Sequence, residues 1–239
     1  FGLSGLIGAM AMPPETRKHK TYKKILGYDE EGYTHIHVMP LNVDVADKSQ
    51  PMVLPIDLVV QELKDAEYIA ILDFCVCRTS FKCEHYPSDF GCIFMGPNAR
   101  QAVKTGAAHR ATVEEAIEHV KKAADLGLIA ACEHVEGEQF VWGVQQNEMN
   151  EYRMICFCCD CCCLTLNLLK QGADEIRDRY TPVGWTAVVD HAKCVGCQKC
   201  AERCPSHAIS YGEDGLRITD QDKCVGCGYC MLNCEHDAI

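Results

Sequence analysis

The sequence lacks the loops with which proteins usually hold nucleotides. Neither G-x-G-x-x-G nor G-x₄-G-K-[ST] occurs in its 239 residues, so we expect no site for a dinucleotide, a flavin or ATP. C-x-x-C-H is also missing, which excludes c-type haem attachment. The C-x₃-C-x₂-C run typical of radical-SAM enzymes and the C-C-G signature are absent as well.

Positive charge is scarce. The 23 Lys and Arg residues face 34 Asp and Glu residues, for a net charge of −11. This balance argues against binding to nucleic acid or to an anionic membrane surface. The apolar segment Phe1–Met12 is too short to span a bilayer and has no basic lead-in, so we expect neither membrane insertion nor a signal peptide.

Cysteine, by contrast, is very abundant. The chain has 19 cysteines, and most of them lie in tight clusters. In a secreted chain this number would suggest disulfides, but clustered spacings favour metal binding in a reducing compartment. We therefore expect a cytoplasmic metal-binding protein.

The most regular cluster is an internal repeat near the C-terminus. Both Asp190–Cys204 and Asp220–Cys234 carry C-x₂-C-x₂-C-x₃-C, and the second copy begins 30 residues after the first. This is the bacterial spacing for [4Fe–4S] cubes, in which the fourth cysteine of each run binds the cube of the other run. The expected ligands are Cys194, Cys197, Cys200 and Cys234 for one cube, and Cys224, Cys227, Cys230 and Cys204 for the other.

Zinc is the alternative for this repeat, because C-x₂-C is also zinc spacing, but zinc takes two separated pairs of cysteines. The residues resemble the two-cluster bacterial ferredoxin family over Trp185–Ile239, which implies two pseudo-symmetric halves that exchange electrons. One departure is that Pro205 follows the first fourth-position cysteine, whereas Glu235 follows the second. A carboxylate beside Cys234 should make reduction of its cube harder, since reduction adds negative charge.

A second group of cysteines lies in the N-terminal part. The apolar run 70–78 predicts a buried strand, and alternation places its two cysteines on one face. Turn residues surround the next two cysteines, Cys83 and Cys92. Together they can hold one iron–sulfur cluster, although buried free thiols are the alternative. Arg78 could donate a hydrogen bond to that cluster, or form a structural ion pair. The four candidate ligands are Cys75, Cys77, Cys83 and Cys92.

The third group packs six cysteines into eight residues. Neighbouring side chains point in different directions on any regular backbone, so all six cannot bind one cube. Some must face a second centre, form a disulfide or stay free. We interpret the segment as the wall of a metal site shared with the preceding group, so that the N-terminal domain holds one or two further clusters. The six are Cys156, Cys158, Cys159, Cys161, Cys162 and Cys163. Cys132 stands alone, and we expect it to be structural.

The remaining pattern predicts an α+β fold. A mixed α/β cysteine-rich domain is expected over residues 55–184, followed by a small bacterial-ferredoxin-like domain over 185–239, with 1–54 as a segment of unassigned structure. Thr112 and Glu115 predict a capping box, and His119 lies off the apolar stripe of that helix, facing solvent. Strands are expected in Gly32–Val43, Leu128–Ala131 and Gln139–Val144, helices in Ile56–Ala66, Thr112–Gly127 and Leu164–Gln171, and a hairpin joining Ala208–Tyr211 to Leu216–Thr219.

Over Pro55–Ile239 the chain also resembles a family of iron–sulfur proteins of anaerobes. The matching features are C-x-C-R at Cys75–Arg78, the I-C-x-C-C-x-C-C-C block at Ile155–Cys163 and the ferredoxin run. The resemblance implies redox work. We expect a low-potential electron-transfer protein or subunit, with redox partners in an anaerobic complex. The alternatives are a reductase with a substrate-binding cluster fed by the ferredoxin domain, and a redox or iron sensor.

Overall fold

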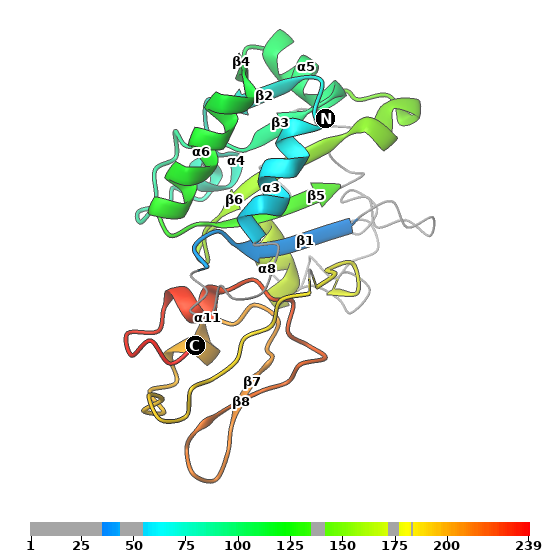
Figure 1. Cartoon of the computed structure of the whole chain (residues 1–239). Coiled ribbons are helices and arrows are strands. Elements are labelled where there is room, and N and C mark those ends of the chain that lie inside the picture. The colour runs from blue at the N-terminus through cyan, green and yellow to red at the C-terminus, as the bar shows by residue number, and fades with distance from the viewer. Residues whose placement is uncertain (1–34, 44–54, 135–141, 172–176, 183) are drawn as a thin grey trace.

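The computed structural model describes residues 35–43, 55–134, 142–171, 177–182 and 184–239. These residues form a six-stranded antiparallel sheet with helices on both faces, and a smaller C-terminal unit (Figure 1). Across the sheet the order is β1 (His35–Pro40), β5 (Ile129–His134), β6 (Arg153–Cys158), β3 (Ile93–Met95), β2 (Ile69–Leu72) and β4 (Ala108–Ala111). The expected α+β class is therefore confirmed.

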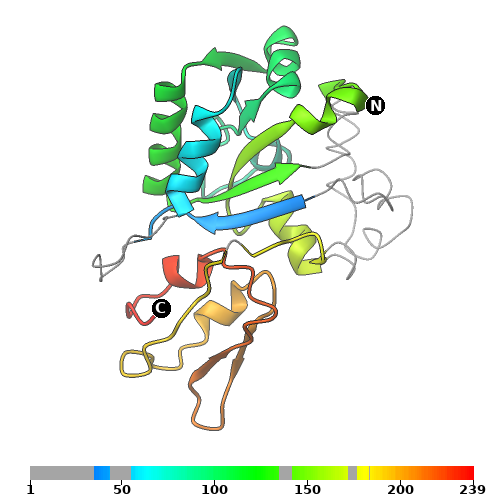
Figure 2. The same ribbon diagram turned by 45° about the vertical axis from the view of Figure 1, so that its right-hand side comes forward.

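Strand alternation gives the sheet two apolar faces. In β2, Ile69 and Ile71 pack on one face, whereas Ala70 and Leu72 pack on the other. The first face is covered by α3 (Pro55–Lys64) and α6 (Val113–Asp125), which lie side by side (Figure 2). The opposite face is covered by α5 (Pro97–Lys104) near β2 and by α8 (Leu164–Gln171) near β1. A 3₁₀ helix, η2 (Gln146–Glu151), lies next to α5.

The helix α6 begins as the sequence predicts. The Thr112 hydroxyl accepts from the N–H of Glu115, whose carboxylate accepts from the N–H of Thr112. His119, however, does not face solvent as predicted. Its ring stacks on Phe90 at 3.9 Å, and Nε2 lies 2.9 Å from the Gly91 carbonyl oxygen. Burial lowers the pKa of His119, so the neutral ring serves as a packing residue.

Two other predictions were wrong. The expected strand 70–78 ends at Leu72, and Cys75 becomes the N-cap of a short helix, α4 (Val76–Ser80), with its Sγ accepting from the N–H of Arg78 at 3.5 Å. Cys75 and Cys77 are therefore not placed by strand alternation. The strand expected in Gln139–Val144 lies partly outside the described residues, and its last three residues are not extended in a strand.

The strand expected in Gly32–Val43 is present as β1. It pairs with β5 over its whole length, from His35 opposite His134 to Pro40 opposite Ile129. The division predicted after residue 54 therefore cuts across one folded unit, because β1 completes the sheet of the cysteine-rich domain. Among the described residues, no helix is both long and apolar enough to cross a membrane.

The C-terminal unit contains the predicted hairpin and two short helices. Its elements are α10 (Lys199–Glu202), β7 (Ile209–Tyr211), β8 (Arg217–Thr219) and α11 (Tyr229–Leu232). The unit packs on β1 and α8 through Val225, Cys227 and Tyr229, which share one apolar cluster with Ile36 and Val38. The Tyr229 hydroxyl donates to the Cys158 carbonyl oxygen at 2.5 Å. The two units therefore meet through a buried contact that includes Cys227 of the second repeat and Cys158 of the six-cysteine segment.

Gly228 controls how closely the two units approach. Its φ is +80°, and a Cβ there would lie 2.4 Å from the Cβ of Pro40 in β1. We expect Gly228→Ala to lower the free energy of unfolding by about 2–4 kcal/mol, from left-handed strain and the clash together, and to speed proteolysis near residue 185. Gly215→Ala is the matched control, because Gly215 has φ +75° with nothing within 4 Å of its Cβ position. Equal effects of the two substitutions, measured by denaturant unfolding, would argue against this packing role.

Candidate metal centres

The eight cysteines of the repeat line two cavities in the C-terminal unit. One, of about 20 Å³, is lined by the outer set, which consists of Cys194, Cys197, Cys200 and Cys234. The other, of about 360 Å³, is lined by the inner set, which consists of Cys204, Cys224, Cys227 and Cys230. The fourth cysteine of each run thus lies with the first three of the other run, in the grouping that the crossed pattern predicts.

The backbone of both runs is suited to hold thiolates. The N–H of Ala208 donates to the Cys204 sulfur and the N–H of Ala238 donates to the Cys234 sulfur, each at 3.4 Å. These equivalent hydrogen bonds follow from the internal repeat and resemble the supporting hydrogen bonds found around metal-bound thiolates. Burial raises the pKa of Cys227 to about 12, and a bound metal ion favours the thiolate form that burial disfavours.

A buried arginine tests whether these cavities fit an anionic cluster. Arg217 in β8 is 2% exposed and lines both cavities. Its Nη2 lies 3.6 Å from the Cys230 sulfur, while Nε and Nη1 are buried without a partner. A buried guanidinium without an anion is strongly unfavourable. A cube carrying four thiolates supplies negative charge and sulfur acceptors at this place, so the residues fit the group.

Glu235, which should oppose reduction of the outer cube, has a cationic partner. Lys199 Nζ lies 2.6 Å from its Oε1. The hydrogen bond to Lys199 lowers the pKa of Glu235, so the carboxylate stays charged, but the ammonium offsets its field at the cluster. The predicted difference between the two cubes therefore depends on this pair as much as on Glu235 alone.

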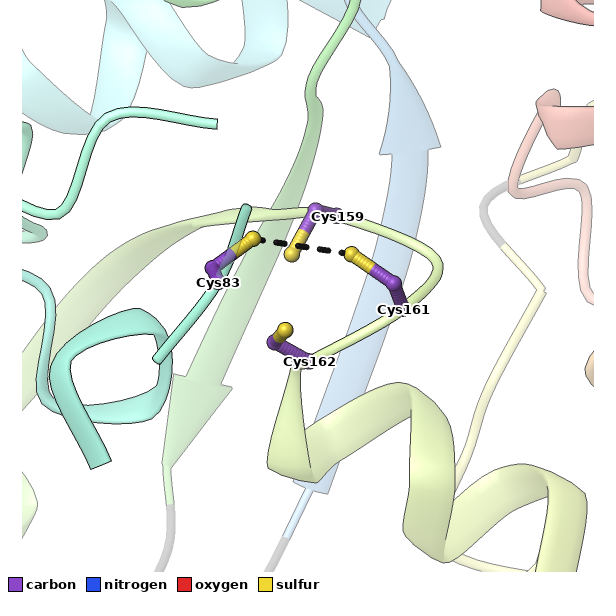
Figure 3. A group of neighbouring side chains, drawn as sticks. All are labelled: Cys83, Cys159, Cys161 and Cys162. Atoms are coloured by element: carbon purple, nitrogen blue, oxygen red, sulfur yellow. Dashed lines mark hydrogen bonds between the residues drawn. The ribbon is translucent and has the colours of Figure 1, made fainter. Parts of the chain in front are cut away.

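In the N-terminal domain, four cysteines form a compact group, the four-thiol group. Their sulfurs all lie within 4.8 Å of one another, and those of Cys83 and Cys161 are 3.7 Å apart (Figure 3). Cys83 comes from the loop after α4, and the other three come from the turn after β6. Cys161 is the exposed member. The group consists of Cys83, Cys159, Cys161 and Cys162.

The thiol of Cys83 is prepared for metal binding. Burial acts to raise its pKa, but hydrogen bonds from the N–H groups of His85 and Tyr86 and from neighbouring thiols outweigh it. The pKa of Cys83 is therefore lowered, and its thiolate is the form that ligates a metal.

Six of the remaining N-terminal cysteines form a second network, the six-thiol group. The Cys158 and Cys163 sulfurs are 2.9 Å apart. From Cys163 a continuous chain of thiol contacts runs on to Cys77, Cys75, Cys92 and Cys156. Cys75, Cys158 and Cys163 are buried and the others half-buried. The group consists of Cys75, Cys77, Cys92, Cys156, Cys158 and Cys163.

The pKa values of the thiols differ widely within the six-thiol group. Contacts with the thiols of Cys77 and Cys92, assisted by the charge of Arg78, lower the pKa of Cys75 to about 2 despite its burial. Contacts with Cys163 and Cys75, together with burial, raise the pKa of Cys77 well above its usual value. The group thus has one thiolate, that of Cys75, among protonated thiols. A metal centre can begin to assemble at this thiolate, and the other thiols then release their protons as they bind.

The geometry of β6 explains why the ten thiols divide into two groups. Alternation directs Cys156 and Cys158 to the α8 face of the sheet, whereas Cys159 packs with the cluster under α3 and α6. Cys132 points to the latter face as well, opposite Ile155 in the register, but belongs to neither thiol group among the described residues. It remains apart, as the sequence predicted.

Arg78 lies between the two groups and is 1% exposed. Its guanidinium donates to the carbonyl oxygens of Pro87 and Phe157, both at 2.8 Å, and of Phe90. Burial opposes its charge, but the neighbouring thiols of Cys75, Cys92 and Cys159 outweigh burial and raise the pKa of Arg78. The side chain thus has a structural role, and its binding to a cofactor stays a prediction.

A cavity of about 500 Å³ opens where the two units meet. Its wall includes Cys161, the exposed thiol of the four-thiol group, and Tyr229 of the C-terminal unit. Arg203 donates to the Asp160 carboxylate across the junction. Sequence reasoning missed this cavity, because its charged and polar lining comes from segments far apart in the chain, among them His85, Asp160, Lys170, Glu202 and Arg203.

Comparison with known proteins identifies the C-terminal unit. Residues 188–239 match the family of the 4Fe-4S dicluster domain. An uncharacterised polyferredoxin-like protein of Methanocaldococcus jannaschii is 53% identical over 32 residues, which are 13% of this chain and 20% of that protein. No solved structure matches the chain. The C-terminal unit is therefore a ferredoxin-type domain that binds 4Fe-4S clusters, and its chemistry is iron–sulfur electron transfer.

Proposed function

We propose that the chain relays single electrons at low potential from two ferredoxin cubes to a third iron–sulfur cluster in the N-terminal domain. The contact at Tyr229 carries this proposal. Cys227 of the inner set and Tyr229 share one apolar cluster with Cys158 and Cys163 of the six-thiol group. Electrons entering at the outer set, where Cys197 is exposed, have a short protein path through the inner set to that group.

In this proposal the outer and inner sets each bind one cube. The six-thiol group provides the ligands of the third cluster, and Arg78 stabilises its negative charge. The acidic chain, with a net charge of −11, docks on basic faces of its redox partners. The chain and these partners are subunits of one cytoplasmic complex in an anaerobe. Nucleic acid is not a partner.

Freeze-quench EPR on the whole chain tests the relay. After mixing with less than one equivalent of dithionite, we expect ordinary reduced-cube signals first, followed by a third signal that grows as they decay. A chain that shows only the two cube signals, at any time and at full reduction, would contradict a third cluster. A third signal that forms independently of the cubes would contradict the relay.

The cavity at Cys161 supports a second candidate function, a reductase. Its size suits a small substrate, and its wall includes Cys161 of the four-thiol group and Tyr229, which precedes Cys230 of the inner set. Binding of cyanide, carbon monoxide or a small thiol should then shift an EPR signal of the reduced chain. A pure electron carrier should leave every signal unchanged under the same additions.

A further inference from the structure

We propose that the four-thiol group binds one metal ion, zinc or iron, in a tetrahedral site, rather than an iron–sulfur cube. The site consists of Cys83, Cys159, Cys161 and Cys162. Four thiolates on a single ion with metal–sulfur bonds of about 2.3 Å place their sulfurs about 3.8 Å apart. The Cys83 and Cys161 sulfurs are 3.7 Å apart, and every pair in the group is within 4.8 Å.

A cube requires wider spacing, because each of its thiolates binds a different iron at a different corner. The two ferredoxin cysteine sets of the same chain provide a comparison for this difference in sulfur spacing. Neither the outer set nor the inner set has even three sulfurs within the 4.8 Å limit, and among the described residues the four-thiol group alone meets it. The six-thiol group is an extended chain of thiol contacts and contributes no set of three sulfurs that are all within this limit of one another. The four-thiol group is therefore built to a different size from the cluster sites.

The surroundings of the group also suit a closed single-ion site. In Figure 3 the four side chains converge from two segments, with Cys83 on one side and the turn after β6 on the other. The N–H groups of His85 and Tyr86 already donate to the Cys83 sulfur, in the manner of the supporting hydrogen bonds found around metal thiolates. With all four positions filled by protein, the ion ties the loop after α4 to the cysteine tract.

This arrangement has a consequence for the cavity between the units. Cys161, which is exposed and lines that cavity, is one of the four ligands. The ion therefore fixes the wall of the cavity. If the ion is iron, it is also a one-electron centre there, since a tetrathiolate iron cycles between the ferric and ferrous states without gaining or losing a ligand.

Metal and sulfide analysis of the intact, anaerobically purified chain separates the possibilities. We expect Cys83→Ser and Cys161→Ser each to lose about one metal ion per chain with no loss of acid-labile sulfide. A cube at this site would instead lose about four irons and four sulfides, which would overturn the proposal. Unchanged metal in both variants would overturn it too, by showing free thiols or a disulfide. Cys132→Ser is the matched control and should lose nothing.

Spectroscopy of the unmodified chain keeps the test independent of variant folding. Zinc-edge X-ray absorption should show four sulfur neighbours at about 2.3 Å. If the ion is iron, the zinc edge will be empty, and oxidation should produce the visible absorption of a ferric tetrathiolate. Either the zinc-edge spectrum with four sulfur neighbours or the ferric absorption supports the proposal. If neither is observed, the proposal is overturned. Absence of the third iron–sulfur cluster, on which the proposed function depends, would be recognised separately by a low total content of acid-labile sulfide.

Discussion

Arg78→Met is expected to lower the free energy of unfolding by about 3 kcal/mol or more. The side chain is 1% exposed and donates to three backbone carbonyl oxygens in two segments, the loop at residues 87–90 and strand β6. Each buried acceptor left unsatisfied costs about 1–3 kcal/mol. The loss should be measured by denaturant unfolding under anaerobic conditions, with the iron content of the purified variant determined in parallel.

Two further variants test whether the lost hydrogen bonds of the guanidinium cause this destabilisation. Arg78→Lys keeps the charge but cannot reproduce the planar fork of donors, so we expect it to recover only part of the stability. Arg110→Met removes an exposed arginine that lies over the Tyr68 ring and should cost less than about 1 kcal/mol. If Arg78→Met were as stable as Arg110→Met, the guanidinium would not hold the loops around the thiol groups together.

Arg217→Met should make the reduction potentials of the ferredoxin cubes more negative, by about 100 mV for the inner cube. A positive charge favours reduction, because reduction adds negative charge. A unit charge about 6 Å away at an effective dielectric constant of about 20 contributes about 3 kcal/mol, which corresponds to about 120 mV for one electron. EPR-monitored redox titration of the intact chain measures this shift directly.

Lys199→Met provides the control for that shift. Lys199 is also a cation near the cubes, but it is exposed and paired with Glu235, so solvent and the carboxylate screen its field. We expect its removal to shift the outer cube far less than removal of Arg217 shifts the inner one. Unchanged potentials in Arg217→Met, with iron content maintained, would show that the guanidinium does not face the clusters.

The sequence predicted those features that depend on local spacing. The paired cysteine runs defined the C-terminal unit and its crossed grouping, because a run of fixed spacing can fold around a cube in few ways. The Thr112 capping box located the start of α6, and apolar spacing located α3. In each case the relevant neighbours are within a few residues, or within one repeat, of each other.

The features that it missed depend on which face a residue occupies. The spacing of Cys75 and Cys77 fits a strand, but it also fits the N-cap and first turn of a helix, which is what forms. In β8 the polarity is reversed, since Arg217 is 2% exposed while Ile218 is 53% exposed. No single-sequence hydrophobic pattern predicts a buried arginine, and here its place is explained only by the cluster cavities that it lines.

The split of the N-terminal thiols could not be read from the sequence for a similar reason. Cys158 and Cys159 are adjacent, yet they pack on opposite faces at the end of β6. Assigning the other eight thiols then requires knowing where the loop after α4 meets the cysteine tract. That contact joins residues about 80 apart, as in the pair Cys83 and Cys161.

The most direct test of the central claim is the acid-labile sulfide and iron content of the intact chain, purified without oxygen. Two ferredoxin cubes and a third cluster predict about twelve sulfides and about twelve irons, with one further ion of zinc or iron. A value of about eight sulfides would contradict a third iron–sulfur cluster and would leave the N-terminal domain with thiols and at most single ions. About sixteen would keep the relay but place a cube in the four-thiol group.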